Sequence, residues 1–134
     1  MTGRCELRIN RTVGVAEARA IRNALRAFLR AIALEEMLCE DVVTAVGEAL
    51  VNAIEHAYSQ SAGEVEVFAR IAADGNLAVD VCDRGTFIAR EKRAERGLGF
   101  TIVNAIARAV SIDTNDGTTV RMIFGTRPNH LHSV

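Results

Sequence analysis

The sequence is short of the residues that mark secreted, membrane-spanning and nucleic-acid-binding proteins. It has three cysteines, no tryptophan, one proline and a single lysine, Lys92. An odd number of cysteines without CxxC spacing, behind an N-terminus with no apolar core, argues against a disulfide framework and a secretory signal, so we expect a cytoplasmic protein. No apolar run reaches the ~18 residues that a membrane span needs. The net charge of −1 lacks the basic excess typical of nucleic-acid binding.

What the chain does have is the composition of one ordinary globular domain. Its 134 residues are 49% hydrophobic and 25% charged, which excludes disordered and collagen-like classes. There is no internal repeat and no Gly/Ser-rich linker, so we expect a single domain over 1–134, with a frayed tail over 126–134.

The hydrophobic pattern predicts strands and helices in a definite order. Apolar residues alternate with polar ones over 5–11, 64–72, 77–82, 111–114 and 119–124, which predicts strands. Helical spacing predicts helices over 15–34, 41–58 and 98–110, and the segment Asp74-Gly75-Asn76 predicts a hairpin turn. We therefore expect an α+β fold, a two-layer α/β sandwich with a mixed, mostly antiparallel sheet and helices on one face.

The second predicted helix carries a polar stripe. Glu48 and Asn52 are four residues apart, so their side chains share one face, and His56 follows one turn later. One interpretation is a solvated helix face. The other is chemical: an Asn oxygen is a hard ligand of the kind that Mg²⁺ takes beside phosphates, and Glu48 would lie within reach of a hydroxyl that attacks phosphorus.

Three shorter segments allow both an ordinary and a chemical interpretation. The segment Asp83-Arg84-Gly85 follows a predicted strand. It is either an ordinary turn or a site where the Asp83 carboxylate accepts a hydrogen bond from an exocyclic amine. Gly97-Leu98-Gly99-Phe100 enters a helix, where exposed N–H groups can bind an anion. Thr119 follows Gly117 at the start of the last strand, where its hydroxyl either belongs to normal strand chemistry or faces a ligand.

Taken together and in this order, these segments resemble the nucleotide-binding boxes of the GHKL ATPases, the superfamily of histidine kinases, gyrase and MutL. The stretches 48–58 and 96–103 are most similar to the bacterial anti-sigma-factor serine kinases, and the resemblance covers about residues 7–124. It implies the Bergerat, histidine-kinase-like ATPase fold, with ATP between the helices and the connecting loop.

The resemblance also implies a role for each site residue. Asn52 is expected to hold Mg²⁺, and Glu48 to act as general base for a serine hydroxyl. The remaining nucleotide contacts are expected from Asp83 on the adenine amino group, Thr119 near it, Gly85 under the ring, His56 beside the nucleotide, and Gly97, Leu98, Gly99 and Phe100 along the phosphates.

Members of that family phosphorylate a STAS-type anti-sigma antagonist on serine and bind a sigma factor as a homodimer. We expect the same here, with no direct contact to nucleic acid or membrane. The alternative is a catalytically weak nucleotide-binding or protein-binding module. It is motivated by Phe87, which stands where many relatives have the second glycine of D-x-G-x-G, and by the short segment before Gly97.

Overall fold

The computed structural model describes residues 6–13, 15–53, 63–83, 101–113 and 117–126. These residues form five strands and three helices, which are β1 (Glu6–Val13), α1 (Val15–Ala31), α2 (Glu36–Asn52), β2 (Gly63–Ile71), β3 (Leu77–Asp83), α4 (Thr101–Ile106), β4 (Ala109–Asp113) and β5 (Thr118–Phe124). None of the described helices has the length and apolar character required to cross a bilayer.

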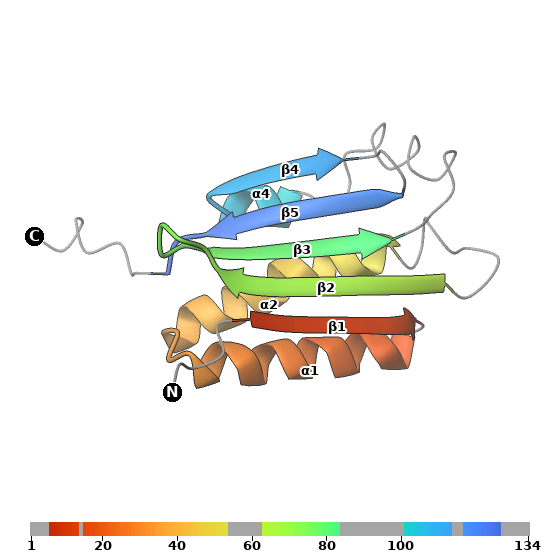
Figure 1. The fold of residues 1–134 in the computed structure, drawn as a ribbon, viewed down its shortest axis with the longest axis horizontal. Helices are drawn as coiled ribbons and strands as arrows, with labels where there is room; N and C mark the ends of the chain where they lie inside the picture. The colour runs from red at the N-terminus through yellow and green to blue at the C-terminus, as the bar shows by residue number, and fades with distance from the viewer. Residues whose placement is uncertain (1–5, 14, 54–62, 84–100, 114–116, 127–134) are drawn as a thin grey trace, which may run out of the picture.

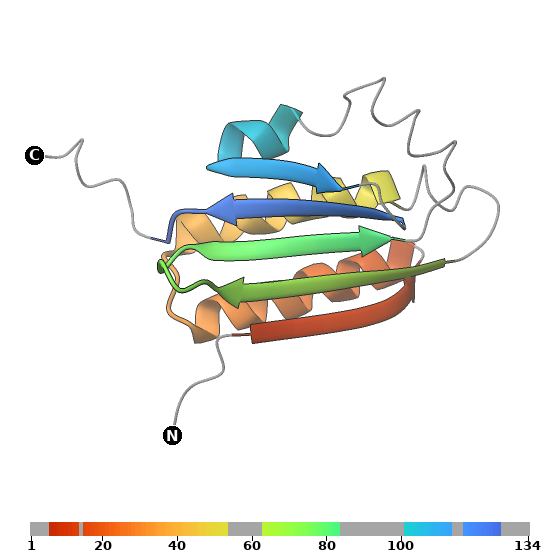
Figure 2. The ribbon, with the colours of Figure 1, turned by 45° about the horizontal axis from the view of Figure 1, so that its top comes forward.

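The strands form one five-stranded sheet in the order β1-β2-β3-β5-β4. Each of the four pairings is antiparallel. The helices lie on one face of this sheet, as both ribbon views show (Figures 1 and 2). The two-layer α+β sandwich predicted from the pattern is therefore confirmed, and its described part contains no parallel pairing.

The hydrophobic core lies between the sheet and the helices. Every second residue of the central strands points into it, including Val65 and Val67 of β2 and Val79 and Val81 of β3. Leu25 of α1 and Val46 and Leu50 of α2 meet them with no exposed surface. Fully burying one such aliphatic side chain stabilises the fold by about 1.5–3 kcal/mol, so this layer positions α2 firmly on the sheet.

The two long helices are joined by a tight turn that sequence reasoning did not place. Ala33 adopts a left-handed backbone with φ of 64°, and the N–H of Leu34 donates to the carbonyl of Leu29 over 3.0 Å. Helix α1 therefore ends at Ala31, before the predicted 34. Helix α2 begins at Glu36, five residues before the predicted 41, because the Glu35 side chain caps it.

Two ion pairs bridge the helices beyond this turn. Arg26 Nε lies 2.9 Å from Glu40 Oε2, and Arg30 Nη2 lies 2.8 Å from Glu36 Oε2. The hydrogen bond from Arg26 holds the pKa of Glu40 below its ordinary value. The Arg30–Glu36 pair is solvent-exposed and contributes little to stability, whereas the Arg26–Glu40 pair is half-buried.

The third predicted helix, over 98–110, is too long at its C-terminal end. The N–H of Ala107 still donates to the carbonyl of Val103, but the N–H of Arg108 donates to the carbonyl of Ile123 on β5 over 2.7 Å. From there the chain runs as β4. The edge of β5 offers backbone partners that a local pattern does not reveal, so pairing replaces the last helical turn.

The β2–β3 hairpin has the predicted turn. Gly75 has a φ of 89°, which a side chain would strain, and the Asp74 carboxylate accepts a hydrogen bond from the N–H of Asn76 over 3.0 Å. The hydroxyl of Thr126, just past β5, donates to the Gly75 carbonyl over 2.7 Å. This end of the sheet is thus closed by its own side chains.

Candidate active site

Asn52, the last residue of α2, is buried without a hydrogen-bond partner for its amide nitrogen. Only 6% of the residue is exposed, and Nδ2 has no partner among the described residues. Leaving a buried donor unsatisfied costs about 1–3 kcal/mol. A bound ligand that accepts from this nitrogen is one way to offset such a cost.

The exposure of the polar side chains on this side of α2 decreases toward its C-terminal end. Asp41 and Thr44 are exposed, Glu48 is half-buried, and Asn52 is buried. The solvated-face interpretation holds for the first two residues only. One turn separates Glu48 from Asn52, so the half-buried carboxylate and the unpaired amide lie along the same side of the helix.

Asp83 ends β3 with its side chain on the helix side of the sheet. Its residue is 4% exposed, and it alternates in phase with Val79 and Val81, which belong to the core. The two ribbon views place the C-terminal ends of β3 and α2 at the same end of the molecule (Figures 1 and 2). The carboxylate of Asp83 and the amide of Asn52 are therefore supplied to one region by the sheet and the helix layer.

Thr119, predicted near the adenine, has its side chain on the face of the sheet away from the helices, because of the register of β5. Thr119 pairs with Cys82, and its hydroxyl donates to Cys82 Sγ over 3.4 Å. Thr118 pairs with Asp83, is 4% exposed, and points to the helix side. Strand alternation could have found this, since the core residue Val120 fixes position 118, not 119, on the covered face.

Burial raises the pKa of the Cys82 thiol, and the hydrogen bond from Thr119 opposes this shift. Because Thr119 and Cys82 are opposite each other on the face away from the helices, their hydrogen bond lies outside the region that holds Asp83.

Six of the predicted site residues lie outside the described residues. They are His56, Gly85, Gly97, Leu98, Gly99 and Phe100. Their roles stay predictions.

Comparison with known proteins assigns the family. The model of the histidine kinase-like ATPase domain matches residues 13–124. The chain belongs to this family. The GHKL resemblance seen in the sequence is thereby confirmed, and the histidine kinase-like ATPase fold accounts for a sheet covered by helices on one side.

Named relatives of this ATPase-domain chain are bacterial regulators. An anti-sigma F factor from Clostridium acetobutylicum is 32% identical over 103 residues, which cover 68% of this chain and 70% of that protein. The serine-protein kinase RsbW from Bacillus velezensis is 32% identical over 111 residues, covering 68% and 69%.

A solved structure is similar over nearly the whole chain. The RsbU and RsbW domains of a Mycobacterium tuberculosis protein match with a TM-score of 0.75 and 30% identity. The match covers 92% of this chain and 33% of that one, so this histidine kinase-like ATPase chain spans about a third of that larger protein.

The residues present fit a magnesium–nucleotide complex. A carboxamide offers one oxygen, which can ligate a hard cation, and one nitrogen, which can donate to a phosphate oxygen. The unpartnered Nδ2 of Asn52 is a donor that such a ligand would satisfy. A buried carboxylate such as Asp83 can accept from an exocyclic amine and would reject a base that lacks one.

Proposed function

We propose that this chain is an ATP-dependent protein-serine kinase that transfers the γ-phosphoryl group of ATP to a serine of a STAS-type anti-sigma antagonist, and that it binds a sigma factor. The observation that carries this proposal is the buried side chain of Asn52, whose amide nitrogen has no hydrogen-bond partner among the described residues, at the same end of the fold as Asp83. The names of the relatives, an anti-sigma factor and a serine-protein kinase, support the choice of substrate and partner. We place its action in the cytoplasm, as a homodimer.

In the proposed mechanism, each residue performs one physical task. Asn52 would hold Mg²⁺ through its amide oxygen, and Mg²⁺ would neutralise charge at the phosphates. The Asp83 carboxylate accepts a hydrogen bond from the adenine amino group, and Thr118 lies beside Asp83 on the next strand. We assign the phosphates to the segment 97–100, which directly precedes α4 in the sequence and contains two glycines, a composition suited to binding an anion through backbone N–H groups.

Glu48 accepts the proton of the substrate serine as its oxygen bonds to the γ-phosphorus. The bond from that phosphorus to the bridging oxygen breaks, and ADP leaves with the electron pair. Because phosphoryl transfer depends mainly on positioning and charge stabilisation, a single base and a fixed ligand set are sufficient. General bases typically contribute 10²–10⁴-fold to rate.

The test is transfer of labelled phosphate from γ-labelled ATP to a purified STAS-domain protein, with Mg²⁺ present. We expect Glu48→Gln to lose at least about 100-fold in transfer while it still binds Mg-ATP in calorimetry. Thr44→Ala, an exposed change one turn earlier, is the matched control and should transfer normally. Equal transfer by wild type and Glu48→Gln would remove Glu48 from the mechanism.

The same calorimetry separates the kinase from the second candidate, a protein-binding module with weak nucleotide chemistry. Phe87 in place of a glycine favours that candidate, because a side chain there limits how close the backbone comes to a ligand. No heat with Mg-ATP up to millimolar concentration would favour the module.

A further inference from the structure

Helix α4 is the shortest of the described helices, and only one side of it packs on the core. Its six residues are too few for a helix that is stable in water by itself, so its position depends on its contacts. Val103 has no exposed surface and belongs to the core, whereas Ile102 is 43% exposed. The contacts at the C-terminal end of α4 are therefore important for its orientation.

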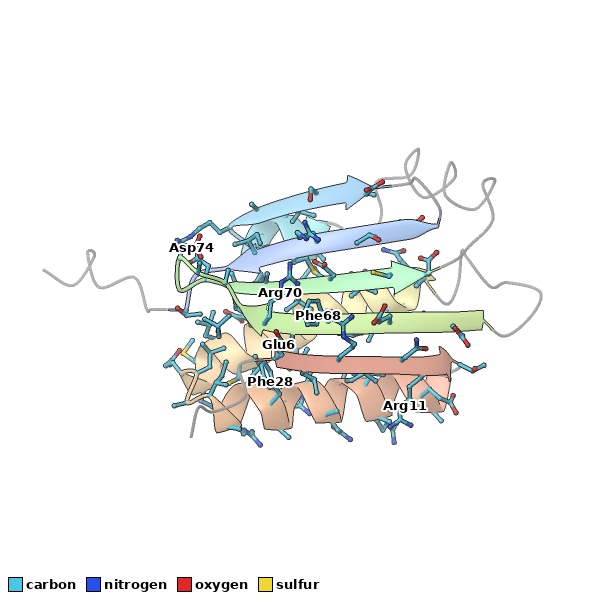
Figure 3. All side chains as sticks on the ribbon, viewed as in Figure 1. Glu6, Arg11, Phe28, Phe68, Arg70 and Asp74 are labelled. Carbon is cyan, nitrogen blue, oxygen red and sulfur yellow. The ribbon has the colours of Figure 1, made fainter. Side chains whose placement is uncertain are left out.

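Arg108, two residues after α4, joins this end of the helix to two other elements. Its backbone N–H donates to the carbonyl of Ile123 on β5 over 2.7 Å. Its side-chain Nη1 donates to Asn76 Oδ1, in the β2–β3 turn, over 3.5 Å. Figure 3 labels Asp74 in the same turn, at the end of the sheet where β5 ends and β4 begins. One residue thus connects the end of α4, strand β5 and the turn.

Gly125 provides the space that the Arg108 side chain occupies. A Cβ atom at position 125 would lie 2.5 Å from Nη2 and 2.9 Å from Cζ of Arg108, which is closer than real Cβ atoms approach. The φ angle of Gly125 is not positive, so the backbone itself would accept alanine. The guanidinium can lie over the end of β5 because residue 125 has no side chain.

The turn that receives Arg108 is held by its own hydrogen bonds. The amide group of Asn76 donates to the Asp74 carboxylate over 3.1 Å, and the backbone N–H of Asn76 donates to it over 3.0 Å. The hydroxyl of Thr126 donates to the Gly75 carbonyl over 2.7 Å. The acceptor of the Arg108 guanidinium is therefore fixed to the sheet, and Arg108 in turn restrains the last turn of α4.

A shift at the C-terminal end of α4 is transmitted to its other end. Six helical residues span only about 9 Å, so a rotation of this helix moves its first residue as well as its last. The chain directly before α4 is the segment to which the proposed function assigns the phosphates.

We propose that Arg108, lying over Gly125, is a positioning residue for ATP binding, because it fixes the orientation of α4 on the sheet. The inference rests on the proposed function, since it requires that the chain before α4 contacts the phosphates. Arg108 itself contacts no part of the nucleotide and acts through the helix.

Two single variants and their combination test this role by calorimetry. Arg108→Ala removes the contact, whereas Gly125→Ala keeps the arginine and displaces its flexible end. Each should weaken Mg-ATP binding by about three- to tenfold. The double variant should bind as Arg108→Ala does, because the added Cβ then has nothing to displace. Arg30→Ala, an exposed change on α1, is the control and should bind normally.

Adenosine distinguishes positioning of α4 from a general loss of structure. It lacks the phosphates, so its affinity depends on Asp83 and Thr118, which lie on the sheet. We expect adenosine to bind all three variants as it binds the wild type. A parallel loss of ATP and adenosine affinity, or an unchanged ATP affinity in Arg108→Ala, would overturn the proposal.

Hydrogen exchange without nucleotide gives a readout that does not depend on ATP binding. The N–H of Ala107 donates to the carbonyl of Val103 in the last turn of α4 over 2.8 Å. Its exchange should be at least about tenfold faster in Arg108→Ala and Gly125→Ala, with the amides of β2 and β3 unchanged. Unchanged exchange at Ala107 beside normal ATP binding by the wild type overturns this inference alone. Absence of ATP binding by the wild type would overturn the proposed function as well.

Discussion

Replacing Asn52 with leucine separates the stability of the fold from the function of the site. Leucine has the same number and branching of side-chain heavy atoms as asparagine but no donor. Because Nδ2 is buried without a partner among the described residues, its removal returns part of a penalty of about 1–3 kcal/mol. We expect Asn52→Leu to raise the free energy of unfolding by about 1–2 kcal/mol in the absence of nucleotide.

The assay is urea or thermal unfolding with and without Mg-ATP. Near 134 residues, 1 kcal/mol corresponds to about 3–5 °C in Tm. Ligand at 100 times its Kd should stabilise the wild type by about 2.7 kcal/mol and should leave Asn52→Leu unchanged. The matched control is Thr44→Leu, exposed on the same helix, which should stay within about 0.5 kcal/mol of wild type.

The reasoning is refuted if Asn52→Leu destabilises the nucleotide-free protein by 1 kcal/mol or more. That result would make Asn52 an ordinary, satisfied polar residue of the core. Retained stabilisation by Mg-ATP in the variant would separately remove Asn52 from the ligand set.

Three further predictions follow from the same contacts. Thr118→Val should weaken Mg-ATP binding in calorimetry, whereas Thr119→Val, on the face away from the helices, should not, and the reverse result would contradict the register argument. The pKa of Glu40 lies below its ordinary 4.5 because Arg26 donates a hydrogen bond to it, so the pair stabilises the fold above that pH and this stabilisation is lost as the pH falls below it. In Glu40→Gln the free energy of unfolding should therefore depend less on pH in this acid range, and an unchanged pH dependence would show that the pair does not contribute. Leu50→Ala should cost about 2–5 kcal/mol in urea unfolding, because Leu50 has no exposed surface, and a loss under 1 kcal/mol would show that the core relaxes around it.

Strand β3, which ends at Asp83, and its neighbour β2 were predictable because their hydrophobic pattern is local. Alternation located β2 and β3 within one residue, and the turn at Gly75 separated them. The same alternation, counted back from the core residue Val120, predicts that Thr118 and not Thr119 lies on the covered face.

The helix boundaries were less predictable for physical reasons. Glu35 caps α2, although glutamate is not among the preferred capping residues, so the first turn carried no recognisable start. The end of α4 depends on the N–H of Arg108 bonding to β5, a partner fifteen residues away. A local window contains no information about such a partner.

The hydrogen-bonded turn formed by Asp74, Gly75 and Thr126 affects which parts of this protein can change in evolution. It secures the end of the sheet that lies away from Asn52 and Asp83. Helix α2 and strand β3 end, and strands β2 and β5 begin, at the opposite end. Substitutions among the residues at that end therefore leave the hydrogen bonds of the turn, and with them the register of β2 and β3, in place.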